Sequence, residues 1–207
     1  MTDRAHSGKM QGMGVYCERI VDLEATEADG ARLATRIIDW LVAEGILTRE
    51  MTREQLYSDY AEEGYAPGPN WRRITLEDWG TGPVAVALGR NTFAEGQGMD
   101  TPEFAKCPAC AADTVIIDFP SGQWEPDRAA WEPLAAGIEA WQRTGVGAAR
   151  CAACDTTSPI PEWRWSSGFA LSSLAFEFWD WPPLTEEFQQ ELAARLGHTI
   201  VRQVVKL

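Results

Sequence analysis

The chain has 207 residues, 45% of them hydrophobic and ten of them tryptophan, so it holds enough apolar material for a folded core. No run approaches the ~20 apolar residues of a membrane-spanning helix, and the first dozen residues lack a secretory signal, so we expect a cytoplasmic protein. The net charge of −13 is concentrated in residues 14–63, which hold twelve acidic side chains against five arginines. Such a surface repels phosphate, which disfavours nucleic acid as a partner, and it suits a basic protein partner.

The N-terminal part begins with residues 1–13, which are polar and non-periodic and for which we predict a disordered tail. Residues 15–23 alternate as a strand, in which Cys17 is interpreted as a buried apolar side chain. Thr26 and Asp29 then imitate a capping box, and apolar residues recur at helical spacing as far as Gly45.

The next stretch predicts a short helix within residues 48–65, a loop at 66–70, and strands at 71–74 and 84–88. The glycines that follow have no phosphate-loop spacing, so they are interpreted as turn residues.

Two Cys-x-x-Cys pairs come next, Cys107 with Cys110 and Cys151 with Cys154. Four thiolates at this spacing suit one tetrahedral ion with metal–sulfur bonds of ~2.3 Å, and the first interpretation is a single structural zinc ion in a closed shell. Iron in a rubredoxin-like site, redox chemistry and disulfides are the alternatives. Redox chemistry is disfavoured because a predicted strand, Thr114–Ile117, follows the first pair in place of a helix.

The segment between the pairs is 40 residues long, whereas zinc-ribbon pairs are usually separated by ~15–20. We therefore expect it to fold as its own element, with a helix that has Pro133 in its first turn and ends at Gly145.

The C-terminal segment predicts a strand at 171–179, a helix capped by Thr185 and stopped at Gly197, and a strand at 200–205. This plan resembles the strand and helix of residues 15–45. It favours an α+β fold with a mixed or antiparallel sheet, helices on one face, ferredoxin-like elements and an inserted zinc-ribbon-like subdomain. The predicted parts are a tail (1–13), an N-terminal α+β part (14–106), the zinc-ribbon-like subdomain (107–165) and a βαβ-like part that completes the sheet (166–207).

Catalytic patterns are scarce. The two histidines, His6 and His198, lie in the tail and after a helix stop, and neither His-Glu-x-x-His nor Gly-x-Ser-x-Gly occurs. We assign no catalytic residue. An alternative hypothesis is an enzyme with Glu177 or Asp180 as base. Its pocket would be lined by Trp163, Trp165, Trp179 and Trp181.

A third hypothesis is a zinc-ribbon protein that binds nucleic acid through a local basic patch of Arg195, Arg202 and Lys206. These three cations near Glu191 are also what an ordinary solvated face contains.

The order of the two cysteine pairs, Trp163-Arg164-Trp165 and the string Phe176 to Leu184 (FEFWDWPPL) resembles a family of uncharacterised actinobacterial proteins. The resemblance implies the zinc-stapled α+β fold and no reaction. One departure is Ala111, which follows Cys110 where such cysteine knuckles favour glycine.

These observations together predict a non-enzymatic, acidic, zinc-stabilised cytoplasmic protein that acts through protein–protein binding, as an immunity protein or an adaptor does.

Overall fold

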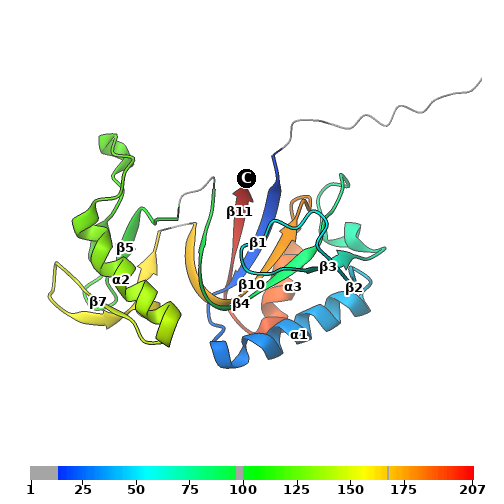
Figure 1. The fold of residues 1–207 in the computed structure, drawn as a ribbon, viewed down its shortest axis with the longest axis horizontal. Coiled ribbons are helices and arrows are strands. Elements are labelled where there is room, and N and C mark those ends of the chain that lie inside the picture. Colours follow the sequence, from blue (N-terminus) through cyan, green and yellow to red (C-terminus); the bar gives the residue numbers. More distant parts are fainter. Residues whose placement is uncertain (1–13, 97–99, 167) are drawn as a thin grey trace, which may run out of the picture.

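The computed structural model describes residues 14–96, 100–166 and 168–207 and divides into two lobes (Figure 1). The larger lobe is a sheet with helices, and the smaller lobe contains both cysteine pairs. The predicted tail at 1–13, with His6, lies outside the described residues. Within the described part of the chain, no helix is long and apolar enough to cross a membrane.

The larger lobe is built on a six-stranded antiparallel sheet with the strand order β11-β1-β10-β4-β3-β2. Its elements are β1 (Tyr16–Asp22), α1 (Glu27–Ala43), β2 (Leu47–Thr52), β3 (Gly64–Pro67), β4 (Val84–Ala94), β10 (Phe169–Trp179), α3 (Glu186–Leu196) and β11 (Ile200–Lys206). Without β2 and β3, the order β1-α1-β4-β10-α3-β11 and the antiparallel neighbours make two interleaved β-α-β units, as in a ferredoxin-like fold. The predicted α+β fold class is confirmed.

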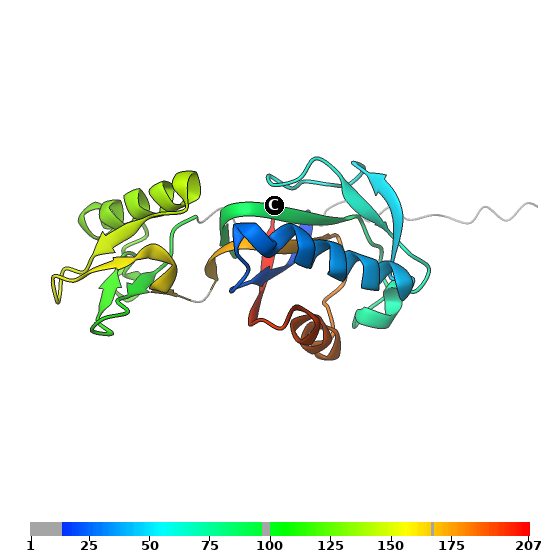
Figure 2. The ribbon, with the colours of Figure 1, turned by 90° about the horizontal axis from the view of Figure 1, so that it is seen from below.

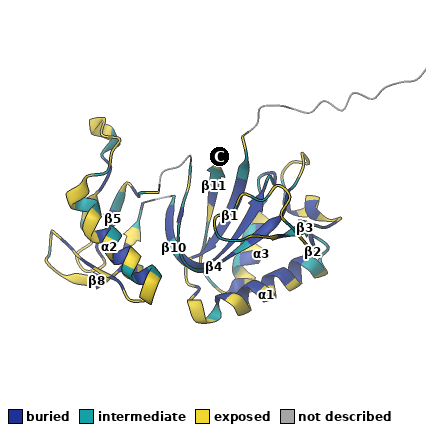
Figure 3. Ribbon diagram, in the orientation of Figure 1, coloured by how far each residue is buried: buried dark blue, intermediate teal, exposed yellow. Residues whose placement is uncertain are grey.

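Helices α1 and α3 pack on one face of the sheet because their apolar residues recur at helical spacing. Leu33, Ile37 and Leu41 of α1 and Phe188 and Leu192 of α3 belong to one buried cluster with Phe176 and Phe178 of β10. The predicted ends are also found: the Thr26 N–H donates to Asp29 at 2.8 Å, and Gly197 ends α3 with φ of 73°. Figure 3 shows these strands and the inner side of α1 as buried.

The opposite face of the sheet is covered by the chain between β2 and β3, where the short helix was predicted within 48–65. That prediction is wrong: the structure has two strands joined by an irregular segment. Tyr57 packs on Trp179 and Tyr60 on Phe93, with ring centroids 5.8 and 5.0 Å apart, so these aromatic residues serve the sheet and not a helix. Figure 2 shows this segment and α3 on opposite sides of the sheet.

The strand predicted at 71–74 is also wrong. Trp71–Ile74 forms a short 3₁₀ helix, and its two buried residues, Trp71 and Ile74, are three positions apart. This spacing places both side chains on one side of a 3₁₀ turn, where they join the cluster beneath α1 and α3.

The smaller lobe is inserted between β4 and β10. It contains β5 (Phe104–Lys106), β6 (Asp113–Val115), α2 (Arg128–Thr144), β7 (Ala148–Arg150), β8 (Thr157–Pro159), β9 (Arg164–Trp165) and the 3₁₀ helices Phe119–Ser121 and Ile160–Glu162. The lobe therefore takes in β5, which precedes Cys107 and pairs with both β6 and β9. Helix α2 begins after Asp127, which caps it, so Pro133 lies in its second turn and not in its first. Gly145 ends it with φ of 79°, as predicted.

Candidate metal centre

Each cysteine pair forms a tight turn held by the same two backbone hydrogen bonds. In the first, the Cys107 N–H donates to the Ala112 carbonyl and the Ala111 N–H donates to the Cys107 carbonyl, both at 2.9 Å. The second pair repeats this, with the N–H of Cys151 and of Asp155 making the equivalent bonds at 2.9 Å. The two turns therefore present their cysteines in the same way.

The residue after the second cysteine of each turn adopts the left-handed conformation. Ala111 has φ of 60° and Asp155 has φ of 65°. A residue with a Cβ is strained in this region, which explains why glycine is favoured there, and Ala111 departs from that preference. The turn forms in spite of this departure.

The four sulfur atoms converge on one point. The Sγ atoms of Cys107, Cys110, Cys151 and Cys154 all lie within 4.8 Å of one another. The Cys107 and Cys154 sulfurs are 3.9 Å apart, and those of Cys110 and Cys151 are 3.8 Å apart. In a regular tetrahedron with metal–sulfur bonds of ~2.3 Å, neighbouring sulfurs are about 3.8 Å apart. The cluster could therefore hold a metal ion, and neither pair is joined by a disulfide.

The cysteine cluster is buried on one side and exposed to solvent on the other. The first cysteine of each turn, Cys107 or Cys151, is buried and belongs to the lobe core with Ile138, Trp141 and Ile160. Cys110 is exposed, and Cys154 is partly exposed. The cluster thus lies at the edge of the apolar core, and its outer side faces solvent.

The crowded sulfurs have unequal proton affinities. Hydrogen bonding by Thr156 lowers the pKa of the Cys154 thiol to about 6. For Cys110, a hydrogen bond from Ala112 lowers the pKa, but the neighbouring sulfur of Cys154 and partial desolvation outweigh it and raise the pKa to about 12. Four thiolates this close together repel one another unless a cation lies between them.

The four tryptophans proposed to line a pocket are not brought together. Trp163 and Trp165 belong to the core of the smaller lobe, Trp181 lies in the cluster beneath α1 and α3, and Trp179 packs on the opposite face of the sheet. Trp181 donates its indole N–H to the Gly82 carbonyl at 2.8 Å, which is a structural contact.

Glu177 and Asp180, named as bases for the enzyme hypothesis, both have structural partners. Glu177 is fully buried and pairs with Arg19, whose Nε donates to it at 2.9 Å. Asp180 accepts a hydrogen bond from the Tyr16 backbone N–H at 3.2 Å. Sequence reasoning missed the Arg19–Glu177 pair, although the position of Arg19 on the inward side of an alternating strand was a signal for it.

Cys17 and His198, the remaining candidate residues, are also in structural contacts. Cys17 is fully buried, as interpreted, and this burial raises its pKa well above the ordinary value. His198 contacts the buried carboxylate of Asp22 through Nδ1 at 2.9 Å. That carboxylate also accepts the N–H groups of Glu24 and Ala25, at 2.9 Å each, so it organises the turn before α1.

The fold and the cysteine cluster thus define an α+β protein with a candidate four-sulfur metal centre in an inserted lobe. No family model, no curated protein and no solved structure matches the chain.

Proposed function

We propose that Cys107, Cys110, Cys151 and Cys154 hold one structural zinc ion, and that the protein acts by binding another protein. The observation that carries the metal assignment is the convergence of four sulfurs within 4.8 Å, with two of the sulfur–sulfur distances, 3.9 and 3.8 Å, at the value of a regular tetrahedron. Four thiolates leave no coordination position for water or substrate, so a zinc ion here stabilises the lobe and takes no part in catalysis.

The metal assignment is tested by metal analysis of protein purified under reducing conditions. We expect one zinc per chain, and we expect Cys110→Ser or Cys154→Ser to lose the ion together with the stability of the lobe, since binding free energy in such sites is folding free energy. Cys17→Ser is the matched control, because Cys17 is buried in the other lobe and should leave the zinc content unchanged. Less than half an equivalent of zinc would contradict the assignment. Finding iron, with visible absorption from its thiolate ligands, would support the alternative of a rubredoxin-like iron site.

The proposed binding role rests on the negative charge of the chain and on the exposed acidic side chains of the segment between β2 and β3. The segment between β2 and β3 turns Leu56 and Tyr60 toward the sheet. The exposed acidic side chains of this region are Glu50, Glu54, Asp59, Glu62 and Glu63. Among these five, and within the described residues, only Glu62 and Glu63 form an ion pair, and both pair with Arg53. We call residues 50–63 the acidic segment, and a basic protein surface is its complement.

A test of this role uses the zinc-loaded protein, immobilised, and an extract of its native host. We expect captured protein to be released by rising salt concentration, and capture to fall when Glu54→Gln and Asp59→Asn neutralise the acidic segment. Glu132→Gln with Glu139→Gln on α2 is the control with an equal change of net charge. Equal loss of capture in both double variants, or capture that salt does not weaken, would contradict this role for the acidic segment.

Membership in the uncharacterised actinobacterial family remains part of this proposal. Its support is the string from Phe176 to Leu184, which supplies the end of β10 and the turn that leads to α3. The structure gives this string a packing role, since Phe178 and Trp181 contact each other edge to face at 5.3 Å. Such a resemblance supports a shared fold and metal and carries no reaction.

A further inference from the structure

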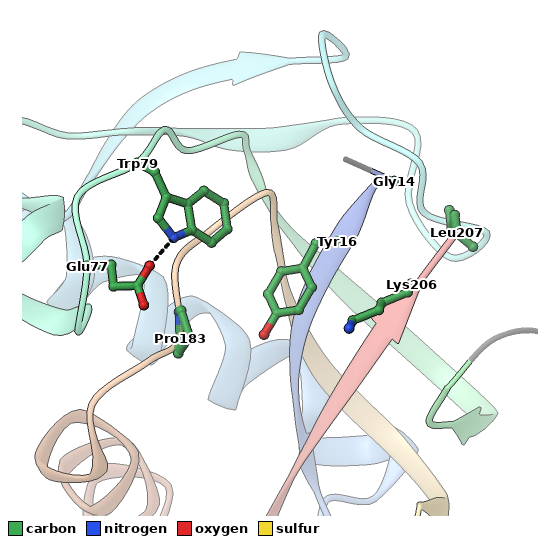
Figure 4. A pocket seen from close by; sticks show the side chains of 7 residues that line it. All are labelled: Gly14, Tyr16, Glu77, Trp79, Pro183, Lys206 and Leu207. Atoms are coloured by element: carbon green, nitrogen blue, oxygen red, sulfur yellow. Dashed lines mark hydrogen bonds between the residues drawn. The ribbon is translucent and has the colours of Figure 1, made fainter. Parts of the chain in front are cut away.

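The larger lobe has a pocket of its own, at the end of the sheet where β1 begins and β11 ends (Figure 4). Its volume is about 410 Å³, which lies in the range of small-molecule sites. Tyr16, Trp79 and Pro183 supply much of its apolar lining, and Lys206 and Glu77 are its charged groups. A second hollow of about 400 Å³ shares Tyr16 and Trp79 with it, so the aromatic pair is open on two sides.

The aromatic side chains of the pocket are held in position. The Tyr16 and Trp79 rings meet edge to face, with centroids 6.2 Å apart and planes at 70°. The indole N–H of Trp79 donates to the Glu77 carboxylate at 2.6 Å, which fixes the ring at the rim of the pocket, as Figure 4 shows. Trp79 nevertheless remains 36% exposed, so a ring face is accessible to a ligand.

Charged side chains of both signs line the pocket, and Figure 4 shows them on opposite sides of Tyr16. Glu18 beside Tyr16 is fully buried and is compensated by Arg202, whose Nη2 donates to it at 2.6 Å, and by the Tyr16 hydroxyl. Glu77 accepts the neutral Trp79 indole N–H, and no cation pairs with it within the described residues. Lys206 lies opposite Tyr16 in the β1–β11 register, and within the described ranges no carboxylate is close enough to pair with it. The pocket therefore combines an aromatic surface with an ammonium group on the Lys206 side and a carboxylate on the Trp79 side.

We propose that this pocket binds a small aromatic anion, with its ring system against Trp79 and Tyr16 and its anionic group at the Lys206 ammonium. Aromatic ligands gain contact energy on fixed indole and phenol rings, and an ammonium on the pocket wall selects a negative charge at one end. The overall charge of −13 repels anions at long range, so this selection operates at contact. The pocket is built by the larger lobe alone, and its function is separate from that of the cysteine cluster.

The test compares two fluorescent probes that share an aromatic body and differ in charge. They are 1-anilinonaphthalene-8-sulfonate and N-phenyl-1-naphthylamine, which lacks the sulfonate, and each is titrated into the zinc-loaded full chain. We expect Lys206→Gln to weaken the sulfonate probe about three- to tenfold, the effect of one partly desolvated ion pair, and to leave the neutral probe unchanged. Trp79→Ala should weaken both probes, because it removes the aromatic wall.

Trp124→Ala is the matched control, since Trp124 is 74% exposed and lies in the other lobe. It should leave both probes unchanged. Lys206 is an exposed residue at the end of a strand, so its substitution tests the pocket without disturbing the fold. Equal binding of the sulfonate probe by Lys206→Gln and the wild type would overturn the proposal. So would equal weakening of that probe by Trp79→Ala and Trp124→Ala, which would indicate general adhesion to exposed indoles.

Discussion

The buried ion pair at the centre of the sheet offers a sharp test of the fold. Arg19 of β1 contacts Glu177 of β10 through Nε at 2.9 Å and through Nη2 at 2.8 Å, with side chains 7% and 0% exposed. The guanidinium lies against the contacting rings of Tyr60 and Phe93, 5.6 and 5.3 Å from their centroids. We predict that Glu177→Ala strongly destabilises the protein, because it leaves this cation buried without its carboxylate.

The expected magnitude follows from the partners that remain. Removing one member of a buried pair costs about 3–5 kcal/mol, a large share of the ~5–15 kcal/mol that stabilises a typical domain. Arg19 keeps a hydrogen bond to the Ala94 carbonyl at 3.2 Å, so we expect the lower end, about 3 kcal/mol. Glu177 Oε2 has no partner among the described residues, so part of its desolvation cost is already present in the wild type. Replacing both residues, as Arg19→Met with Glu177→Leu, should therefore recover most of the loss.

The assay is urea unfolding of the zinc-loaded protein, followed by far-ultraviolet circular dichroism. The control is Glu191→Ala, which breaks an exposed pair with Arg195 of similar length, 2.7 Å, and should cost about 0.5 kcal/mol or less. The reasoning is refuted if Glu177→Ala and Glu191→Ala lower the free energy of unfolding equally. It is also refuted if the double variant is as unstable as Glu177→Ala alone.

Three further predictions concern backbone geometry and pH. Ala111→Gly should stabilise the smaller lobe by about 0.5–1 kcal/mol by relieving the left-handed strain, measured as slower loss of zinc to a chelator. Gly147→Ala should cost more than about 2 kcal/mol, since its Cβ would lie 2.0 Å from the Gly137 carbonyl oxygen, and thermal melting would show the loss. The third prediction concerns Asp29: desolvation raises the pKa of its carboxyl group, but the hydrogen bond from the Thr26 N–H outweighs this and holds the pKa below its ordinary value of 3.8. A carboxyl group whose pKa is lower in the folded state than in the unfolded state stabilises the fold above its unfolded-state pKa, and this stabilisation is lost as the pH falls through its folded-state pKa. Asp29→Asn should therefore reduce the loss of stability measured below about pH 4.

Local sequence signals predicted the elements whose ends are set by neighbouring residues. The helix at 27–43 has a cap at Thr26, and the helix at 186–196 has Thr185 before it and Gly197 after it. The cysteine cluster was equally accessible, because each turn is determined by residues that are adjacent in the sequence. Each of these caps and turns has its partners within one short segment, whereas the convergence of the two cysteine turns depends on contacts 41 and 47 residues apart in the sequence.

The wrong predictions occurred where the determining contact is distant in sequence. Tyr57 and Tyr60 have a helix-like spacing, but their neighbours are Trp179 and Phe93, on strands that sequence periodicity cannot place. The partner of Arg19 is likewise 158 residues away. The Tyr16–Trp79 pocket draws on four separate segments, so no sequence window contains it.

The position of the inserted lobe in the fold explains why a bound metal ion would stabilise it. Its two ends continue from β4 and into β10, which are antiparallel neighbours with Ala94 opposite Phe169, so the sheet already holds the ends together. Arg90 adds a second tether, since its Nε donates to the Gln142 carbonyl at the end of α2 at 3.0 Å. What the sheet does not supply is order inside the lobe, whose apolar core is small and would be marginal alone. An ion held by the two cysteine turns, which are 40 residues apart, would fix that interior, while the larger lobe has a core of its own.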